Sequence, residues 1–159
     1  KRRIQTRTTK MIKIGNNLSE WSAYSCQPKT KDNLDRLIDE RIREQGVNCD
    51  LNDIDVSQIT DMSYLFYGSK FNGDISNWDM SNVTDMTCMF FYSFFNQPIG
   101  DWDISKVKSM RSMFYDSDFN QDISKWQISK DCNTNDMFKN CPIKSEYKPK
   151  TLQNDQDRK

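Results

Sequence analysis

The feature that most constrains this chain is an apolar pattern that recurs every 24 residues between positions 51 and 146. When 51–74, 75–98, 99–122 and 123–146 are aligned, eight columns agree, with Asp131 and Thr134 as exceptions. The columns are Leu51, Ile75, Ile99, Ile123; Ile54, Trp78, Trp102, Trp126; Val56, Met80, Ile104, Ile128; Ile59, Val83, Val107; Met62, Met86, Met110; Leu65, Met89, Met113, Met137; Phe66, Phe90, Phe114, Phe138; and Phe71, Phe95, Phe119, Ile143. A fixed period of this size predicts stacked supersecondary units.

Each unit is expected to begin with a strand and to end with a helical turn. Ile54 and Val56 alternate around an aspartate, which is the strand period, whereas Met62, Leu65 and Phe66 have the spacing of a helical face. The residue before each helical face is suited to an N-cap: Asp61, Asp85, Ser109 and Asn133. The pattern therefore predicts an α/β stack with a parallel sheet on one side and short helices on the other.

A longer helix is predicted over 30–45. Thr30 is a suitable N-cap, Leu34 and Ile38 share one face, and Gly46 ends the helix. Because the first unit of a stack needs a cover, we expect this helix to cap the first coil rather than to bind a partner.

Two phrases point to a family: FNGDISNWDMSNVTDMTCMF at 71–90 and FNQDISKWQIS at 119–129. They resemble the BspA-like leucine-rich-repeat proteins, which occur as bacterial surface proteins and mycoplasma lipoproteins and in some protists and viruses. The resemblance covers about 51–143 and extends weakly to the preceding helix. It implies a right-handed leucine-rich-repeat-like solenoid of about four coils with an N-terminal capping helix, at the cell surface or outside the cell. Ile59, Val83 and Val107 stand where ordinary leucine-rich repeats carry an asparagine ladder, so regular horseshoe curvature is in doubt.

Composition argues against catalysis and against a cofactor. The chain has no histidine and no nucleophile or phosphate-loop motif, so only carboxylates and lysines remain for acid–base chemistry, and we expect no enzyme. The five cysteines, Cys26, Cys49, Cys88, Cys132 and Cys141, lack paired spacing and are interpreted as free thiols. No apolar run is long enough for a transmembrane segment. We expect Lys1 to mark a processed form or a fragment, which leaves the compartment open.

Polar residues are expected to point outward from the predicted sheet in two rows. They are Asp53, Asp55, Asn77, Asp79, Asp101, Asp103, Lys125 and Gln127. Neighbouring strands would bring the carboxylates close together, and their repulsion needs an offset. A basic or polar protein surface, a hard cation such as Ca²⁺, or water and salt would supply it; no calcium-loop motif is present.

Aromatic residues beyond the core columns form a second candidate surface. We predict an aromatic stripe for partner binding from Tyr67, Phe91, Tyr92, Phe94 and Tyr115. The return loop could instead fold some of these rings inward. The tryptophan column is interpreted as a core ladder, with a sugar-binding platform as the alternative.

The chain is expected to comprise a basic arm over 1–29, a capping helix and entry over 30–50, the stacked units over 51–146 and a polar tail over 147–159. The arm carries Lys1, Arg2, Arg3, Arg7, Lys10 and Lys13. Residues before position 51 are net positive, with eleven basic and seven acidic residues, whereas 51–126 carries five basic residues and eleven aspartates.

We expect a non-catalytic protein-interaction module of the surface recognition or adhesion type, which binds through the sheet face or the aromatic stripe. The alternative is an accessory structural subunit of a large assembly, held by the basic arm and the tails. Nucleic acid stays open as a partner of the arm alone. The sequence leaves the oligomeric state undetermined.

Overall fold

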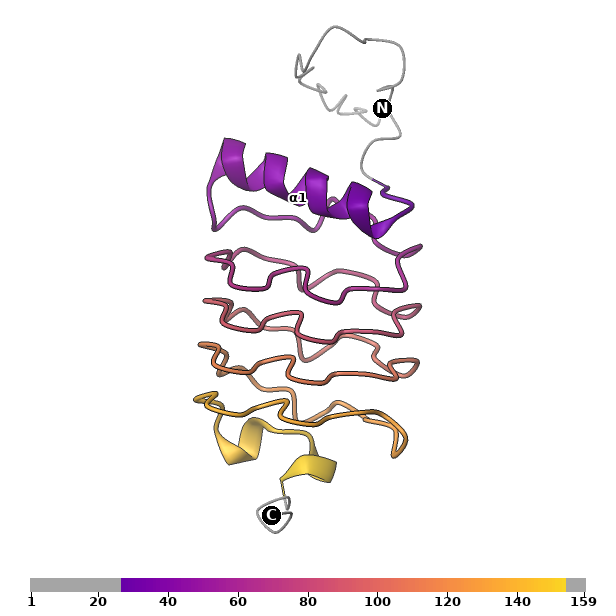
Figure 1. The fold of residues 1–159 in the computed structure, drawn as a ribbon, viewed down its shortest axis with the longest axis vertical. Helices are drawn as coiled ribbons and strands as arrows, with labels where there is room; N and C mark the ends of the chain where they lie inside the picture. The colour runs from indigo at the N-terminus through magenta and orange to yellow at the C-terminus, as the bar shows by residue number, and fades with distance from the viewer. Residues whose placement is uncertain (1–26, 154–159) are drawn as a thin grey trace, which may run out of the picture.

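The computed structural model describes residues 27–153, which form a stack of hydrogen-bonded turns beneath one α-helix (Figure 1). The helix is α1 (Lys31–Gln45), and two short 3-10 helices, η1 (Ser145–Tyr147) and η2 (Lys150–Leu152), lie below the stack. Isolated parallel bridges join Asp61 to Asp85, Asp85 to Ser109 and Ser109 to Asn133. We call the successive turns of chain that carry these four residues levels 1 to 4.

The predicted helix over 30–45 is confirmed. The Thr30 side chain accepts a hydrogen bond from a backbone N–H of the first turn, as an N-cap does. Gly46 ends α1 with a φ of 90° and donates its N–H to the carbonyl of Ile42. Leu34 and Ile38 are buried and belong to the same core as the levels below, so α1 covers the top of the stack.

A ladder of backbone hydrogen bonds holds each level to the next. In level 1, the N–H groups of Met62, Tyr64, Phe66 and Gly68 donate to the carbonyls of Asp85, Thr87, Met89 and Phe91 at 2.8–2.9 Å. The residues between these donors bond within their own level, as Leu65 does to Met62 and Tyr67 to Tyr64. The same arrangement joins levels 2 and 3 and levels 3 and 4. Every second N–H therefore lies along the stack, and the others close tight turns.

This ladder overturns the predicted fold class. Residues 27–153 contain no strand and no sheet, so the parallel sheet and the leucine-rich-repeat solenoid that requires it are both wrong. The segment expected to be a strand is folded into turns, in which Ile54 donates to Leu51 and Ile59 donates to Val56. A strand ladder needs extended backbone that bonds alternately in both directions, and backbone used for turns within a level cannot supply it.

The predicted short helices are also absent from the described levels. Tyr64 lies within the expected helical face, yet its φ is 61°, in the left-handed region that a right-handed helix excludes. The equivalent residues Cys88, Ser112 and Asp136 have φ between 52° and 54°. The predicted N-caps act differently as well. Asp61, Asp85 and Asn133 each accept the N–H two residues later, which makes an Asx turn instead of a helix start.

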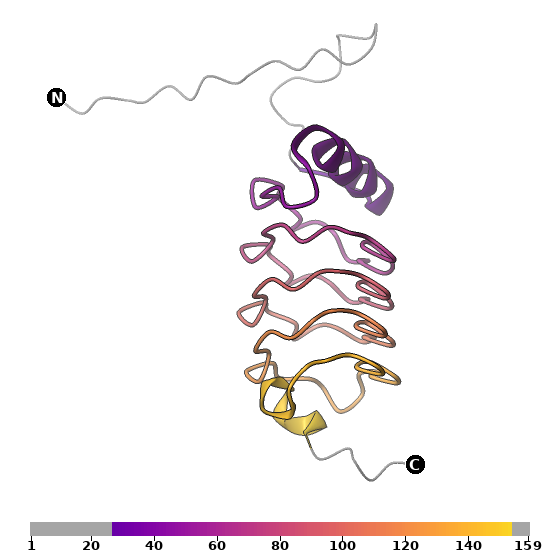
Figure 2. The ribbon, with the colours of Figure 1, turned by 90° about the vertical axis from the view of Figure 1, so that its left-hand side faces the viewer.

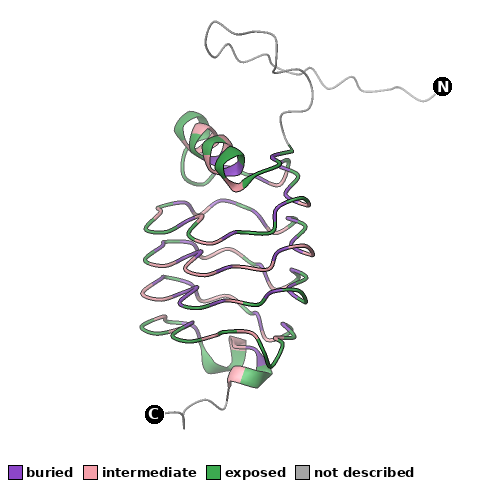
Figure 3. Cartoon of the chain, turned by 45° about the vertical axis from the view of Figure 1, so that its right-hand side comes forward, coloured by how far each residue is buried: buried purple, intermediate pink, exposed green. Residues whose placement is uncertain are grey.

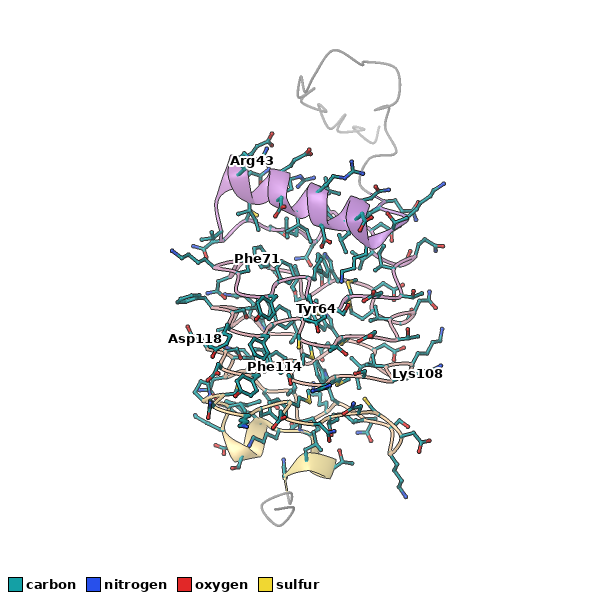
Figure 4. The ribbon with its side chains drawn as sticks, viewed as in Figure 1. Arg43, Tyr64, Phe71, Lys108, Phe114 and Asp118 are labelled. Carbon is teal, nitrogen blue, oxygen red and sulfur yellow. The ribbon has the colours of Figure 1, made fainter. Side chains whose placement is uncertain are left out.

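Phenylalanine rings form a continuous column within the core. Phe66, Phe90, Phe114 and Phe138 stack from level to level at 5.5, 5.5 and 5.8 Å between centroids, within 5° of parallel. Figure 3 shows buried positions recurring along the levels with exposed positions between them, and Figure 4 shows the labelled Phe71 and Phe114 on one side of the interior. The apolar columns read from the sequence therefore supply most of the buried side chains.

The tryptophan column is a structural ladder, as interpreted. Trp78, Trp102 and Trp126 are 3–5% exposed, and the last two rings stack at 6.5 Å. Each indole N–H donates to a backbone carbonyl 27 residues earlier, as Trp78 does to Leu51 at 2.9 Å. Each ring is buried and its N–H has a hydrogen-bond acceptor. The ring faces are therefore not exposed for a sugar to stack on.

An asparagine ladder closes the stack at a column that sequence reasoning did not single out. The Oδ1 atoms of Asn72, Asn96 and Asn120 accept the backbone N–H groups of Asn96, Asn120 and Lys144 at 2.8–3.0 Å. The signal in the sequence was the asparagine that follows each phenylalanine of the 71, 95 and 119 column.

We predict that Phe90→Ala destabilises the fold by about 3–5 kcal/mol, because Phe90 is fully buried between two parallel rings. Urea unfolding followed by tryptophan fluorescence would measure the change. Phe94→Ala is the control, since Phe94 is exposed and should alter stability by no more than about 0.5 kcal/mol. Equal effects of the two substitutions would contradict the stacked core.

Candidate functional site

The first predicted surface, the rows of polar residues, exists without a sheet. Asp55, Asp79 and Asp103 are exposed, and each carboxylate accepts the backbone N–H of the serine two residues later at 3.0 Å. Hydroxyl and N–H hydrogen bonds from these serines hold the pKa of all three carboxyls below the usual range. The carboxylates are therefore engaged in turns of the chain itself.

Repulsion within this row is real but small. The neighbouring carboxylates Asp55 and Asp103 raise the pKa of Asp79, yet the hydrogen bonds from Ser81 lower it further than that repulsion raises it. The offset that the sequence left open is thus supplied in part by the Asx turns. In residues 27–153, no group of three or more acidic or cysteine side chains is arranged to hold a metal ion.

The second row of polar residues divides among different contacts. Asp53 forms an ion pair with Arg41 of α1 at 2.6 Å, which ties the helix to level 1. Asp101 and Lys125 approach at 3.4 Å, but both are almost fully exposed and the pair contributes little. Asn77 donates its N–H to Asn52, and Gln127 donates its side-chain amide to the carbonyl of Lys125. These residues share a surface but do not converge on one point.

The aromatic stripe is brought together for four of its five predicted members. Tyr67, Phe91 and Tyr115 stack at 5.1 and 4.8 Å with planes within 9° of parallel. Tyr92 meets the edges of Phe91 and Tyr115 at 4.8 and 6.3 Å. Tyr67 and Tyr92 are 51% and 54% exposed, whereas Phe91 and Tyr115 are half-buried. We use aromatic ladder for Tyr67, Phe91, Tyr92 and Tyr115 from here on.

The ends of the aromatic ladder are closed by residues that the sequence did not predict. Tyr64, which is 55% exposed, packs on Tyr67 at 5.9 Å, and the Lys31 ammonium lies 5.9 Å from the Tyr64 ring centroid. At the other end, the Lys139 ammonium lies 5.5 Å from the centre of the Tyr115 ring. Figure 4 shows Tyr64 near the middle of one broad side of the stack. Tyr64 lies two residues after Met62 of the methionine column. In the predicted helix this position is an exposed one with no assigned role.

Phe94 lies apart from the aromatic ladder. It lines a shallow groove with Asn48, Lys70, Asn72, Asn96 and Asp118. Its column neighbours are Lys70 and Asp118, so no aromatic residue precedes or follows it at the 24-residue spacing. The prediction that Phe94 belongs to the stripe is therefore not met by the packing.

The hydroxyl of Tyr92 is tied to the stack itself. It donates a hydrogen bond to the Asp116 carboxylate, and this bond, together with the charge of Asp116, raises the pKa of Tyr92. The charge of Cys88, followed by a hydrogen bond to its sulfur, raises the pKa of Tyr64. The Tyr92 hydroxyl proton is therefore already engaged, and its oxygen remains an acceptor in a polar rim around apolar rings.

Comparison with known protein families assigns most of the chain to a family. The model of the family described as Mycoplasma protein of unknown function, DUF285, matches residues 34–149. The chain belongs to the DUF285 family. Comparisons with curated proteins and with solved structures gave no match.

The DUF285 match includes both candidate surfaces, since it runs from inside α1 to the residue before η2. The match excludes the basic arm. The basic residues of the arm also lie outside the described residues, so their predicted role stays a prediction; they are Lys1, Arg2, Arg3, Arg7, Lys10 and Lys13. Over 27–153, no helix has both the length and the apolar character needed to cross a membrane.

We predict that acid unfolds this DUF285 chain partly through its Asx turns. Asp55, Asp79 and Asp103 have a lower pKa when folded than when unfolded, so the folded state binds fewer protons. Their contribution is complete above the unfolded pKa of about 3.9 and is lost as the pH falls through the folded values.

The test replaces all three with asparagine, whose side-chain oxygen still accepts the serine N–H but does not titrate. Thermal unfolding measured from about pH 6 to about pH 2.5 should show a shallower loss of stability for the variant than for the parent chain. Parallel pH profiles would show that these turns do not contribute.

Proposed function

We propose that this chain is a non-catalytic protein-interaction module that binds its partner through the aromatic ladder. The observation that carries the proposal is the exposure of stacked rings that the core does not need. Tyr67 and Tyr92 are about half exposed, although the buried phenylalanine column already fills the interior beside them. Exposed aromatic patches with polar rims are typical of protein-binding surfaces.

The geometry of the rings favours a protein over a sugar. A sugar stacks on an open ring face, but both faces of Phe91 are covered by Tyr67 and Tyr115. Lys139 covers the outer side of Tyr115, and Tyr64 packs at the other end. The aromatic ladder thus presents ring edges and hydroxyl groups, which suit aliphatic side chains, aromatic faces and backbone carbonyls of a partner.

The polar rows are less suited to partner binding than the aromatic ladder. Asp55, Asp79 and Asp103 are bonded to their own serines and stay hydrated, so they gain little from a partner. Aromatic side chains gain more, because they lose apolar surface to the interface and have little conformational freedom to lose.

The resemblance of 71–90 and 119–129 to BspA-like surface proteins adds a setting to the proposal. We infer that this DUF285 chain is related to that group and acts in recognition or adhesion at a cell surface. The alternative, an assembly subunit held by its basic arm, depends on residues outside 27–153 and stays a prediction.

We predict that Tyr67→Ser with Tyr92→Ser weakens partner binding by at least about tenfold, which corresponds to 1.4 kcal/mol, while both exposed sites leave the fold intact. The partner would be captured from the native source with a photoreactive phenylalanine analogue at position 67. Binding of the captured protein would then be measured by calorimetry.

Two control variants decide which surface acts. Phe94→Ser removes a ring that is as exposed as Tyr92 but lies outside the aromatic ladder, and it should bind normally. The triple asparagine variant of Asp55, Asp79 and Asp103 should also bind normally. Normal binding by the tyrosine variant, with loss in the asparagine variant, would assign function to the polar rows instead.

A further inference from the structure

The lower edge of level 4 carries a row of backbone donors with no acceptor. In each higher level, four N–H groups donate to carbonyls of the level below. The matching positions in level 4 are Thr134, Asp136, Phe138 and Asn140. Within 27–153, none of these four N–H groups has a hydrogen-bond acceptor. Between levels 3 and 4 the corresponding N–H groups all have acceptors at 2.8–3.0 Å. The donors are Met110, Ser112, Phe114 and Asp116, and the acceptors are the carbonyls of Asn133, Asn135, Met137 and Lys139. Unpaired rows of this kind are templates for another chain.

A groove runs beneath this donor row. Thr134, Asp136 and Phe138 line one side, and Ser145, Lys148, Leu152 and Gln153 from η1, η2 and the residues around them line the other. In Figure 2, η1 and η2 lie under one side of the last level and leave the other side without a following turn of chain. The groove is therefore open where the next level would lie.

The core also ends without its usual neighbour at this place. Each phenylalanine of the central column has another ring below it, but below Phe138 lies the Lys148 ammonium, 5.6 Å from the ring centroid. A lysine can swing away at small cost, because its side chain is flexible and its charge prefers water. An apolar side chain placed there would gain the burial that the higher rings already have.

We propose that the lower edge of level 4 binds a segment of a partner protein that adopts the same tight turns as the levels above and takes the place of a further level. The segment would offer a carbonyl at every second residue to the four N–H groups, as 85–91, 109–115 and 133–139 do to the levels above them. It would set a bulky apolar side chain under Phe138. Acidic side chains fit beside it, since the groove carries Lys139 and Lys148 against the single acid Asp136, which Lys139 already pairs at 3.8 Å. Main-chain pairing of this type gives affinity, and the pocket side chains give specificity.

A second copy of the chain does not fit this edge. The complementary row of carbonyls is at level 1, where α1 covers the stack and Lys31 bonds to the Ser63 carbonyl and hydroxyl. Head-to-tail stacking would need α1 to leave its buried contacts through Leu34 and Ile38. The edge and the aromatic ladder meet at Lys139, which lines the groove and lies over the Tyr115 ring, but none of the four edge donors belongs to the aromatic ladder.

The test uses amide hydrogen exchange by NMR on the full chain, with a synthetic peptide of sequence SMRSMFYDSDF as the probe. This sequence is that of residues 109–119, whose carbonyls already accept the equivalent row in level 2. In the free chain, Thr134, Asp136, Phe138 and Asn140 should exchange at least about 100-fold faster than Met110, Ser112, Phe114 and Asp116. The peptide at about 1 mM should slow the four edge amides by at least about tenfold and leave the others unchanged.

Two controls keep the outcome specific. The same residues in reverse order, FDSDYFMSRMS, should give no protection. Ser145→Trp, which fills the groove, should abolish protection by the forward peptide, whereas the neighbouring Glu146→Trp, outside the groove lining, should keep it.

Four results would overturn the proposal. They are slow exchange of the edge amides in the free chain, protection that rises with protein concentration alone, equal protection by the reversed peptide, and no response to the forward peptide. Tyr67→Ser with Tyr92→Ser should respond to the peptide like the parent chain, so failure here is distinguishable from failure of the aromatic ladder.

Discussion

The hydrogen bonds that run from one level to the next are the interaction on which this structure depends. Four N–H groups per level, those of Met62, Tyr64, Phe66 and Gly68 in the first, lie along the stack and meet carbonyls of the level below. They fix the vertical spacing, and that spacing allows the phenylalanine column to stack at 5.5–5.8 Å. The backbone accepts the left-handed φ of Tyr64 and its equivalents because the ladder and the core oppose any relaxation.

The backbone hydrogen bonds between levels also determine the chemistry of the two candidate surfaces and of the two ends of the stack. Side chains at matching positions are brought directly over one another, so Tyr67, Phe91 and Tyr115 become a continuous ladder of rings. Aspartates in a matching column repel one another, and hydrogen bonds from the serines two residues later offset part of that repulsion. At the top, α1 covers the carbonyl end of the stack. At the bottom, η1 and η2 leave the donor end partly open.

Several parts of this arrangement could be predicted from the residues alone. Thr30 and Gly46 define α1 because capping depends only on local backbone groups. The tryptophan and phenylalanine columns were placed in the core because apolar side chains at a fixed period must share one interior. The same reasoning predicts the stacking of Tyr67, Phe91 and Tyr115, because these residues share one column of the repeat. The prediction that Phe94 joins them differs from the packing, because position in the sequence does not show toward which side of a turn a side chain points.

What the sequence determined by itself was which side chains are buried, which positions recur and where α1, the one α-helix of residues 27–153, lies. Only the tertiary structure decided the backbone between those positions. Apolar spacings of two, three and four residues fit strands and helices, but they also fit consecutive turns. The choice depends on whether each N–H bonds within its own level or to a level 23 residues away, and a linear pattern carries no record of that partner. For the same reason, the asparagine ladder at Asn72, Asn96 and Asn120, the closed ends of the aromatic ladder and the unpaired donors below Asn133 became visible only in the folded chain.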